Sequence, residues 1–274
     1  MNKMRFNRFA GWLVAGLMIA FSPMLPANEA VRIGDAAGAP MQAVRFAAIQ
    51  YGLKFKSDFE ISINAFSPAG ALKALDEGKL DMVFINTAAI PADYRGRQQI
   101  YAAEALVFYV SADNPVRKLT TAQLQEIWEG KQPVWSWYGG SNLDVQRLGV
   151  KLTDSNSMEQ QFFGESRFNK GIFRVHSTGQ AMMMLNPASL LAAPYRTDYP
   201  VSVEVLSVDG VKPDSRTIAD GTYPLSRRYS LLVAAKPARY TDGLIKILHS
   251  GAVYRELKNS GLLFLGKIGG EAKK

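Results

Sequence analysis

Cysteine is absent from the 274 residues of the chain, and histidine occurs only twice, as His176 and His249. Without cysteine there can be no disulfide framework and no lipid anchor of the lipoprotein kind. Zinc and other transition metals need several histidine or cysteine ligands, and neither histidine has a second one three or four residues away. We therefore expect no metal and no cofactor, and a fold that is stabilised by its hydrophobic core.

The motifs of the common catalytic sites are lacking as well. The chain contains no nucleophile elbow, no phosphate-binding P-loop and no dinucleotide-binding fingerprint. A catalytic site needs a nucleophile with a base that activates it, and no such pair stands out. The sequence therefore indicates a binding protein and not an enzyme. A phosphatase-like reaction would need metal ligands that this sequence does not offer.

Long apolar runs are lacking except near the N-terminus. Three basic residues and no acidic one precede the run 9–21, which is apolar apart from two glycines. A helix that spans a bilayer needs about 20 apolar residues, so this run is too short. Pro23 and Pro26 follow it, and Ala27 offers the small residue at which a signal peptidase cuts. We expect residues 1–27 to be a signal peptide and the mature protein to be periplasmic, with an uncleaved membrane anchor as the alternative.

Neither sign of charge is concentrated in the mature chain. Removing residues 1–27 lowers the formal net charge from +8 to +5. The basic residues are scattered, as Arg95, Arg97, Arg117, Lys118, Arg147, Lys151, Arg227 and Arg228 illustrate. A surface that binds nucleic acid needs clustered basic residues, so we expect no nucleic-acid partner. A mildly positive surface would help a small anion to approach, although such charge also serves ordinary solubility.

Short apolar strands alternate with helical patterns from residue 31 to residue 260. The expected strands cover 31–34, 59–66, 82–85, 105–110, 143–152, 201–208 and 229–235. The expected helices cover 41–51, 69–77, 242–249 and 252–260, and three more begin at capping boxes at 120–123, 156–159 and 177–180. This order predicts the α/β class, with mixed sheets that carry helices on both faces.

Two of the expected strands are placed to connect two lobes. The crossings fall near residues 109 and 228, so the first lobe is discontinuous in the sequence. We expect residues 28–108 and 228–274 to form the first lobe and residues 109–227 to form the second. The two crossing strands would then act as a hinge.

Polar loops follow several of the expected strands and lead into helices. Unpaired N–H groups at a helix start attract anions, and open α/β sheets bind ligands at the carboxyl ends of their strands. The predicted ligand-binding residues are Asp35, Ala36, Ala37, Ser67, Asn86, Thr87, Ser155, Asn156 and Ser157. The alternative is that each serine or asparagine only caps a helix.

Several blocks of sequence resemble the phosphate-binding proteins of ABC transporters. The first runs from Leu119-Thr120 to Gly130-Lys131 and continues as Trp135-Ser136-Trp137-Tyr138-Gly139-Gly140. The segments 113–116, 208–213 and 220–227 are similar to that family's two crossing segments. The resemblance implies a periplasmic receptor with two α/β lobes, a hinge of two crossing strands and a ligand cleft between the lobes.

The phosphate-binding motifs of that family are altered in this chain. The family uses an arginine and a G-S-G-T helix start, and the resemblance places Leu152 at the former and Ser155–Met158 at the latter. Asn86 stands at the aspartate that accepts the phosphate proton, whereas Ser67 keeps the hydroxyl of the second loop. Asp35 replaces a small residue and would repel a singly charged group by about 4 kcal/mol at 4 Å and an effective dielectric constant near 20. Tight phosphate binding is therefore not expected.

Three further interpretations concern individual side chains. Arg147 or Lys151 could replace the missing arginine, because both precede the 155–157 loop. An aromatic cluster is assigned to the core and not to a sugar-binding platform: Trp128, Trp135, Trp137 and Tyr138. Met182, Met183 and Met184 are assigned to helix packing.

These observations predict a monomeric substrate-binding protein of the phosphate-receptor type. It would bind a small anion or polar solute between its lobes and deliver it to an ABC permease. The alternative is a periplasmic sensory or protein-interaction module that kept the fold, lost phosphate binding and has another envelope protein as its partner.

Overall fold

The computed structural model describes residues 30–55, 60–131, 134–151, 158–164 and 171–266. They form two compact units. Unit 1 holds the described residues up to Gln99 together with Ser230–Val253, and unit 2 holds those of Ile100–Tyr229 and 254–266. The sequence placed 254–266 in the first lobe, whereas the compact units place it in unit 2. The lobe limits stay a prediction, and the predicted signal peptide lies outside the described residues.

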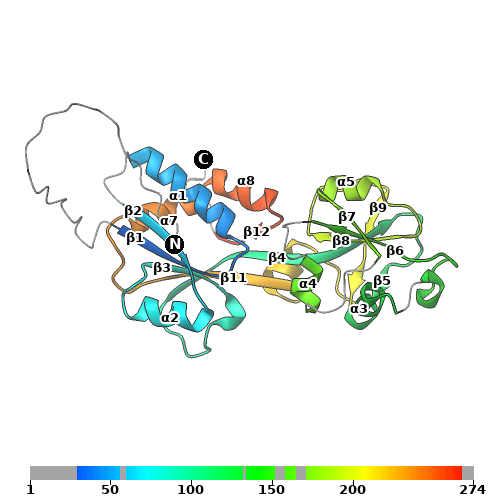
Figure 1. Ribbon diagram of the computed structural model, residues 1–274, viewed down its shortest axis with the longest axis horizontal. Coiled ribbons are helices and arrows are strands. Elements are labelled where there is room, and N and C mark those ends of the chain that lie inside the picture. Colours follow the sequence, from blue (N-terminus) through cyan, green and yellow to red (C-terminus); the bar gives the residue numbers. More distant parts are fainter. Residues whose placement is uncertain (1–29, 56–59, 132–133, 152–157, 165–170, 267–274) are drawn as a thin grey trace, which may run out of the picture. The chain divides into compact units, whose positions relative to one another are not determined.

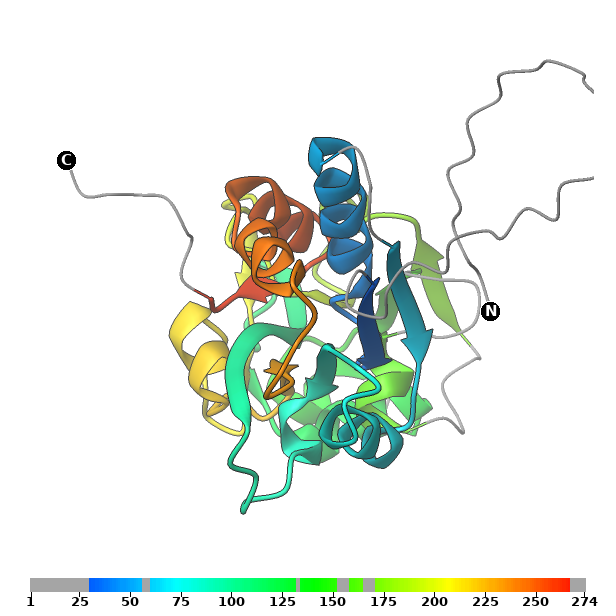
Figure 2. The same ribbon diagram turned by 90° about the vertical axis from the view of Figure 1, so that its left-hand side faces the viewer.

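Unit 1 contains parallel strands with helices on both faces. The strands are β1 (Ala30–Ala36), β2 (Glu60–Ala65) and β3 (Met82–Asn86), and their order is β2-β1-β3, with β11 (Ser226–Val233) beside β3. Helix α1 (Met41–Phe55) and helix α7 (Thr241–Leu248) lie side by side on one face, and α2 (Pro68–Asp76) covers the other (Figure 1; Figure 2). The η1 turn (Thr87–Ala89) follows β3.

The core of unit 1 includes an apolar cluster between β3 and α2. Residues 82–85 of β3 are fully buried, as expected for a strand with helices on both faces. Ala71, Ala74 and Leu75 on the inner face of α2 contact Val83 and Ile85 in one apolar cluster. Ser67 caps α2, and Gly78 ends this segment with a positive φ of 67° that favours glycine.

Unit 2 is a mixed sheet with shorter helices. The strand order is β4 (Arg97–Ser111), β8 (Ser189–Pro194), β6 (Gln146–Val150) and β7 (Ile172–Val175). Strand β8 runs antiparallel to β4 and parallel to β6, which is parallel to β7. The remaining strands are β9 (Val203–Val205) and β12 (Leu263–Phe264), which pair with β4, and the separate pair β5 (Lys118–Leu119) and β10 (Ser207–Val208). The helices are α3 (Thr121–Glu129), η2 (Trp135–Tyr138), α4 (Met158–Phe163), α5 (Thr178–Met183), α6 (Ser215–Asp220) and α8 (Gly251–Asn259), the last of which begins in unit 1.

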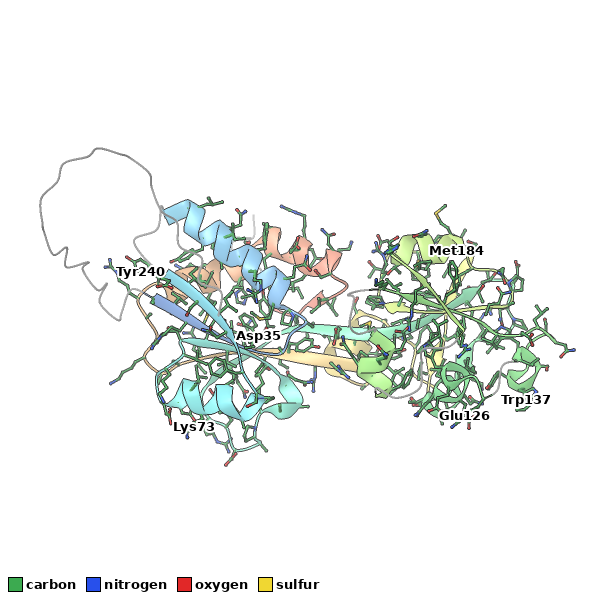
Figure 3. The ribbon with its side chains drawn as sticks, in the orientation of Figure 1. Asp35, Lys73, Glu126, Trp137, Met184 and Tyr240 are labelled. Carbon is green, nitrogen blue, oxygen red and sulfur yellow. The ribbon has the colours of Figure 1, made fainter. Side chains whose placement is uncertain are left out.

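The α/β class with mixed sheets is confirmed. The expected strand at 201–208 is split into β9 and β10, because the chain leaves β4 after Val205 and pairs with β5. Of the aromatic cluster, Trp128 and Trp135 are fully buried, whereas Trp137 is 62% exposed, so its assignment to the core was wrong (Figure 3). Met183 is likewise 85% exposed. Among the described residues no helix combines the length and apolar character needed to span a bilayer.

Candidate functional site

The carboxyl ends of three parallel strands meet at one edge of unit 1. Asp35 of β1 lies opposite Ala65 of β2, and Ala36 lies opposite Ile85 of β3. The loops that follow therefore leave the sheet side by side. This register brings together six of the predicted ligand-binding residues: Asp35, Ala36, Ala37, Ser67, Asn86 and Thr87. Figure 3 labels Asp35 near the end of β1.

The first loop is closed by its own carboxylate. Asp35 Oδ1 accepts hydrogen bonds from the N–H groups of Gly38 at 2.8 Å and Ala37 at 3.2 Å. Gly38 has a φ of +75°, which turns the chain into α1, and its carbonyl accepts from Met41 N–H at 3.1 Å. The N–H of Ala37, which the sequence assigned to a ligand, is thus bonded to Asp35 in this structure.

The second loop carries Ser67 as the cap of α2. Its Oγ accepts from the N–H of Gly70 at 3.2 Å, and Pro68 occupies the first helical turn. Ser67 is exposed, so its O–H can still donate to another group. The cap that the sequence predicted is confirmed, and a cap and a ligand contact are compatible roles for one hydroxyl.

The third loop adds an amide and a pair of hydroxyls. Asn86 Oδ1 accepts from Ala88 N–H at 3.0 Å and so caps the η1 turn. Thr87 Oγ1 lies 2.9 Å from the Oγ of Ser230, which belongs to β11 and is 2% exposed. Ser230 was not predicted from the sequence, where it stands between Tyr229 and the apolar run 231–235. Four neighbouring strands therefore bring polar side chains to this edge.

The electrostatics of this edge are set by one carboxylate. Asp35 is half-buried, and it forms no ion pair with any residue that the structure describes. Among the described residues, no group of three histidine, cysteine, aspartate or glutamate side chains could hold a metal ion. The edge therefore offers hydroxyl, amide and carboxylate groups, which suit hydrogen bonding to a small polar molecule.

The loop predicted for the second half, Ser155, Asn156 and Ser157, lies outside the described residues. It precedes α4, in which Glu159 is 1% exposed. Glu159 Oε1 lies 2.8 Å from Arg174 Nη1, and Glu159 Oε2 has no hydrogen-bond partner in the described part of the chain. This buried pair joins α4 to β7.

Of the two candidate replacement cations, Arg147 binds the end of α3 through its side chain. Arg147 Nη1 donates to the carbonyl of Trp128 at 2.7 Å, at the last turn of α3, and burial lowers the pKa of Arg147. Arg147 also lies in the first half of β6, whereas the 155–157 loop follows the end of this strand. The structure thus engages Arg147 with α3, where the guanidinium meets the negative end of a helix. Lys151 is bonded through its backbone N–H to Val175 O at 2.8 Å.

A cation that the sequence did not single out is held against α4. Arg227 of β11 stacks over the ring of Phe162 at 4.3 Å and donates to the carbonyl of Gln161.

A buried pair of titratable side chains also lies in unit 2, where the hydroxyl of Tyr229 donates to the carboxylate of Glu104. Burial raises the pKa of Glu104, and the Tyr229 bond and the charge of Arg227 only partly offset it. Burial also raises the pKa of Tyr229, so this phenol stays protonated.

Comparison with known proteins adds a family and a fold. The model of the PBP superfamily domain matches residues 36–250. Phosphate-binding protein PstS of Pseudomonas aeruginosa is 27% identical over 214 residues, which cover 67% of this chain and 66% of that protein. PstS of Bacillus subtilis is 26% identical over 197 residues, covering 68% and 64%. The chain thus spans just under two thirds of the length of these curated relatives.

Solved structures match over more of the chain. An ABC-type phosphate transport receptor from Vibrio cholerae has a TM-score of 0.63 and 17% identity, covering 85% of this chain and 99% of the other. A possible phosphate binding protein from Planctomyces limnophilus has a TM-score of 0.66 and 17% identity, covering 86% and 93%. PstS from Borrelia burgdorferi has a TM-score of 0.62 and 16% identity, covering 87% and 100%. At these identities the likeness shows a shared fold.

Proposed function

The chain belongs to the PBP superfamily, within the PstS-like phosphate-binding protein family, and on that premise we propose that it is a periplasmic receptor for a small anion or polar solute. The predicted resemblance and the predicted periplasmic binding protein fold are confirmed. The family consists of substrate-binding receptors and not of enzymes. The receptor role, the ligand and the compartment of this chain are the proposal.

One observation carries the proposal. The carboxyl ends of β1, β2 and β3 bring a carboxylate, an amide and hydroxyl groups to one edge of unit 1. Ligands of open α/β sheets bind at this edge. The proposed ligand-binding residues are Asp35, Ala36, Ala37, Ser67, Asn86 and Thr87, with Ser155, Asn156 and Ser157 from the second half.

The proposed biological role is uptake through an ABC permease. The names of the relatives describe phosphate-binding proteins, and one of the solved structures is named as a phosphate transport receptor. This chain differs from that family at Leu152, Asn86 and Asp35, the positions that the resemblance assigns to its phosphate contacts. We therefore propose the transport role with a ligand that need not be phosphate.

Calorimetric titration of the chain from Asn28 onward tests the proposal. Phosphate, sulfate, organic anions and neutral polar solutes are titrated separately, and one of them is expected to give saturable heat. At a ligand concentration of one hundred times Kd, binding stabilises the folded state by about 2.7 kcal/mol, which is visible as a rise in Tm. Absence of heat and of a Tm shift with every solute would contradict a receptor function.

A matched pair of serine variants locates the site. Ser67 and Ser177 each cap a helix by accepting one backbone N–H at 3.2 Å, but Ser177 caps α5 in unit 2. Ser67→Ala and Ser177→Ala should each lower the free energy of unfolding by about 1 kcal/mol. Only Ser67→Ala should also weaken ligand binding, by about fivefold for one lost hydrogen bond. Equal affinities of the two variants would place the ligand elsewhere.

A second candidate function is a sensory or protein-interaction module without a solute. The hydrogen bonds of Asp35 within its own loop favour this function, because the N–H groups of Ala37 and Gly38 are satisfied without a ligand. The ligand-free protein should then capture an envelope protein from a membrane extract, and no solute in the titrations should compete. Competition by a solute would speak for the receptor.

A further inference from the structure

We propose that the carboxylate of Asp35 occupies the N–H groups of the first loop and so prevents doubly charged oxyanions from binding there. The same carboxylate favours a solute that carries hydrogen-bond donors. The inference rests on the proposed receptor function and names the ligand class of that same site. The solute would carry hydroxyl or ammonium groups and no double negative charge.

The hydrogen bonds of Asp35 supply the first step of the argument. Its Oδ1 accepts from both Gly38 and Ala37, at 2.8 and 3.2 Å. Ala37 and Gly38 lie in the loop four and three residues before α1. Adjacent N–H groups in a tight turn can bind an oxyanion. Here a carboxylate of the chain takes that position, so an external oxyanion finds these donors already engaged.

The place of Asp35 in the sheet supplies the second step. β1 is the middle strand of the three, because β2 and β3 pair with it on either side. Asp35 lies opposite Ala65 on one neighbour and Phe84 on the other. A solute that contacts both Ser67 and Asn86 therefore lies beside the carboxylate of Asp35.

The charge balance supplies the third step. Asp35 forms no ion pair with the described residues, and its second oxygen, Oδ2, accepts no hydrogen bond from them. A half-buried carboxylate without a cation repels a second anion more strongly than it would in water. The same oxygen is a strong acceptor for a hydroxyl or an ammonium group. Ser67 and Thr87 can donate or accept as the solute requires.

Two substitutions distinguish the effect of the charge of Asp35 from the effect of its hydrogen bonds to Ala37 and Gly38. Asp35→Asn removes the charge but keeps an oxygen that can accept from Ala37 and Gly38. Asp35→Ala removes both and leaves the two N–H groups open. The matched control is Asp214→Ala in unit 2, because Asp214 Oδ1 also accepts two N–H groups, from Arg216 at 2.8 Å and Thr217 at 2.7 Å.

Calorimetric titration of the wild type and the three variants gives the test. Sodium sulfate is the main probe, since it is fully ionised and has no donor, and inorganic phosphate, a hexose, glycerol and putrescine are the others. We expect the wild type to ignore sulfate at millimolar concentration and Asp35→Ala to bind it at least about tenfold more tightly, a difference of about 1.4 kcal/mol. Asp35→Asn should gain less, and Asp214→Ala should gain nothing. A hexose, glycerol or putrescine should bind the wild type more tightly than either Asp35 variant.

The outcomes distinguish this inference from the proposed function. Sulfate or phosphate binding by the wild type as tight as by Asp35→Ala would overturn the role of Asp35 and leave the receptor function standing. An equal gain in sulfate affinity for Asp214→Ala would also overturn it. The effect would then follow from removing any carboxylate that accepts two backbone N–H groups. If no variant and no wild-type protein binds any of the solutes, the receptor function itself fails. Circular dichroism and thermal unfolding of Asp35→Asn show whether the fold is kept.

Discussion

Asp81, one residue before β3, binds two separate segments of unit 1. Its side chain is 1% exposed, and its Oδ2 accepts from the backbone N–H and the Nε of Arg32 at 2.8 and 2.9 Å. Its Oδ1 accepts from Ala238 N–H at 2.9 Å. Burial by itself would raise the pKa of Asp81, but the hydrogen bonds from Arg32 and Ala238 outweigh it and hold this pKa below its ordinary value.

The substitution Asp81→Asn should lower the free energy of unfolding at pH 7 by about 2–3 kcal/mol, because the charge-assisted hydrogen bonds from Arg32 to this buried carboxylate are lost. A carboxyl group whose pKa is lower in the folded state contributes stability above its unfolded pKa, near 3.9, and this contribution is lost as the pH falls through the folded pKa. Wild-type stability should therefore fall below about pH 4. Urea unfolding between pH 7 and pH 3 measures both effects.

Glu77→Gln is the control for Asp81→Asn. Glu77 is paired with Lys73 and Lys79 but is 37% exposed, so its loss should cost less than about 1 kcal/mol. Asp81→Asn should also flatten the acid limb of the stability curve, whereas Glu77→Gln should leave it in place. Equal costs for the two variants would show that burial does not strengthen the Arg32–Asp81 pair.

The candidate site could be predicted from the sequence only where its residues act locally. Ser67 is followed by proline at a helix start, and the sequence alone identified it as a cap. The hydrogen bonds of Asp35 to the next turn depend on side-chain rotamers that no pattern fixes. The contact between Thr87 and Ser230 joins residues 143 positions apart, so it follows from strand pairing and not from spacing.

At the scale of elements, local signals predicted the ends of helices best. Thr120 and Gln123 form the reciprocal capping box that begins α3, and Gly130 ends this helix with a φ of +76°. Strand β8 was missed, because its sequence Ser-Leu-Leu-Ala-Ala-Pro lacks the β-branched and aromatic residues typical of strands. It is a strand because it is buried between β4 and β6, a tertiary effect that overrides local propensity.

A glycine permits the contact between three elements of unit 2. Gly149 of β6 lies opposite Arg174 of β7 in the parallel register. A Cβ atom at Gly149 would lie 2.2 Å from Arg174 Nη1 and 2.6 Å from Glu159 Oε1 of α4. The missing side chain is therefore what allows Glu159 to reach Arg174 at 2.8 Å across the face of β6.

Gly149→Ala should push the guanidinium of Arg174, whose side chain is 25% exposed, away from the buried carboxylate of Glu159. The weakened hydrogen bond should lower the free energy of unfolding by about 1–2 kcal/mol. Thermal and urea unfolding measure the loss. Gly179→Ala is the matched control, because a Cβ atom there has no neighbour within 4 Å and alanine favours a helix over glycine. The control should be neutral or slightly stabilising. A loss of the same size in both variants would contradict the role given to the empty space at Gly149.

At the scale of the whole molecule, the N-terminal segment differs from the rest of the chain in its charge, because it has basic residues and no acidic ones. Residues 1–27 carry three basic side chains and no acidic one, so their removal takes the net charge from +8 to +5. The proposed receptor would work in the periplasm and would first have to be exported. A basic start followed by a short apolar run is typical of an export signal. The apolar run is shorter than the bilayer requires.

Export of the full chain in a Gram-negative host should therefore end with cleavage after Ala27, leaving Asn28 as the first residue of the mature protein. N-terminal sequencing of the periplasmic fraction identifies this residue directly. Ala27→Glu should block cleavage, because the peptidase needs a small residue at that position, and the precursor should then stay in the membrane fraction at its full mass. A wild-type chain that keeps Met1 and stays in the membrane would instead support the uncleaved anchor. The receptor would then work tethered to the membrane, and its diffusion to a permease would be confined to the membrane surface.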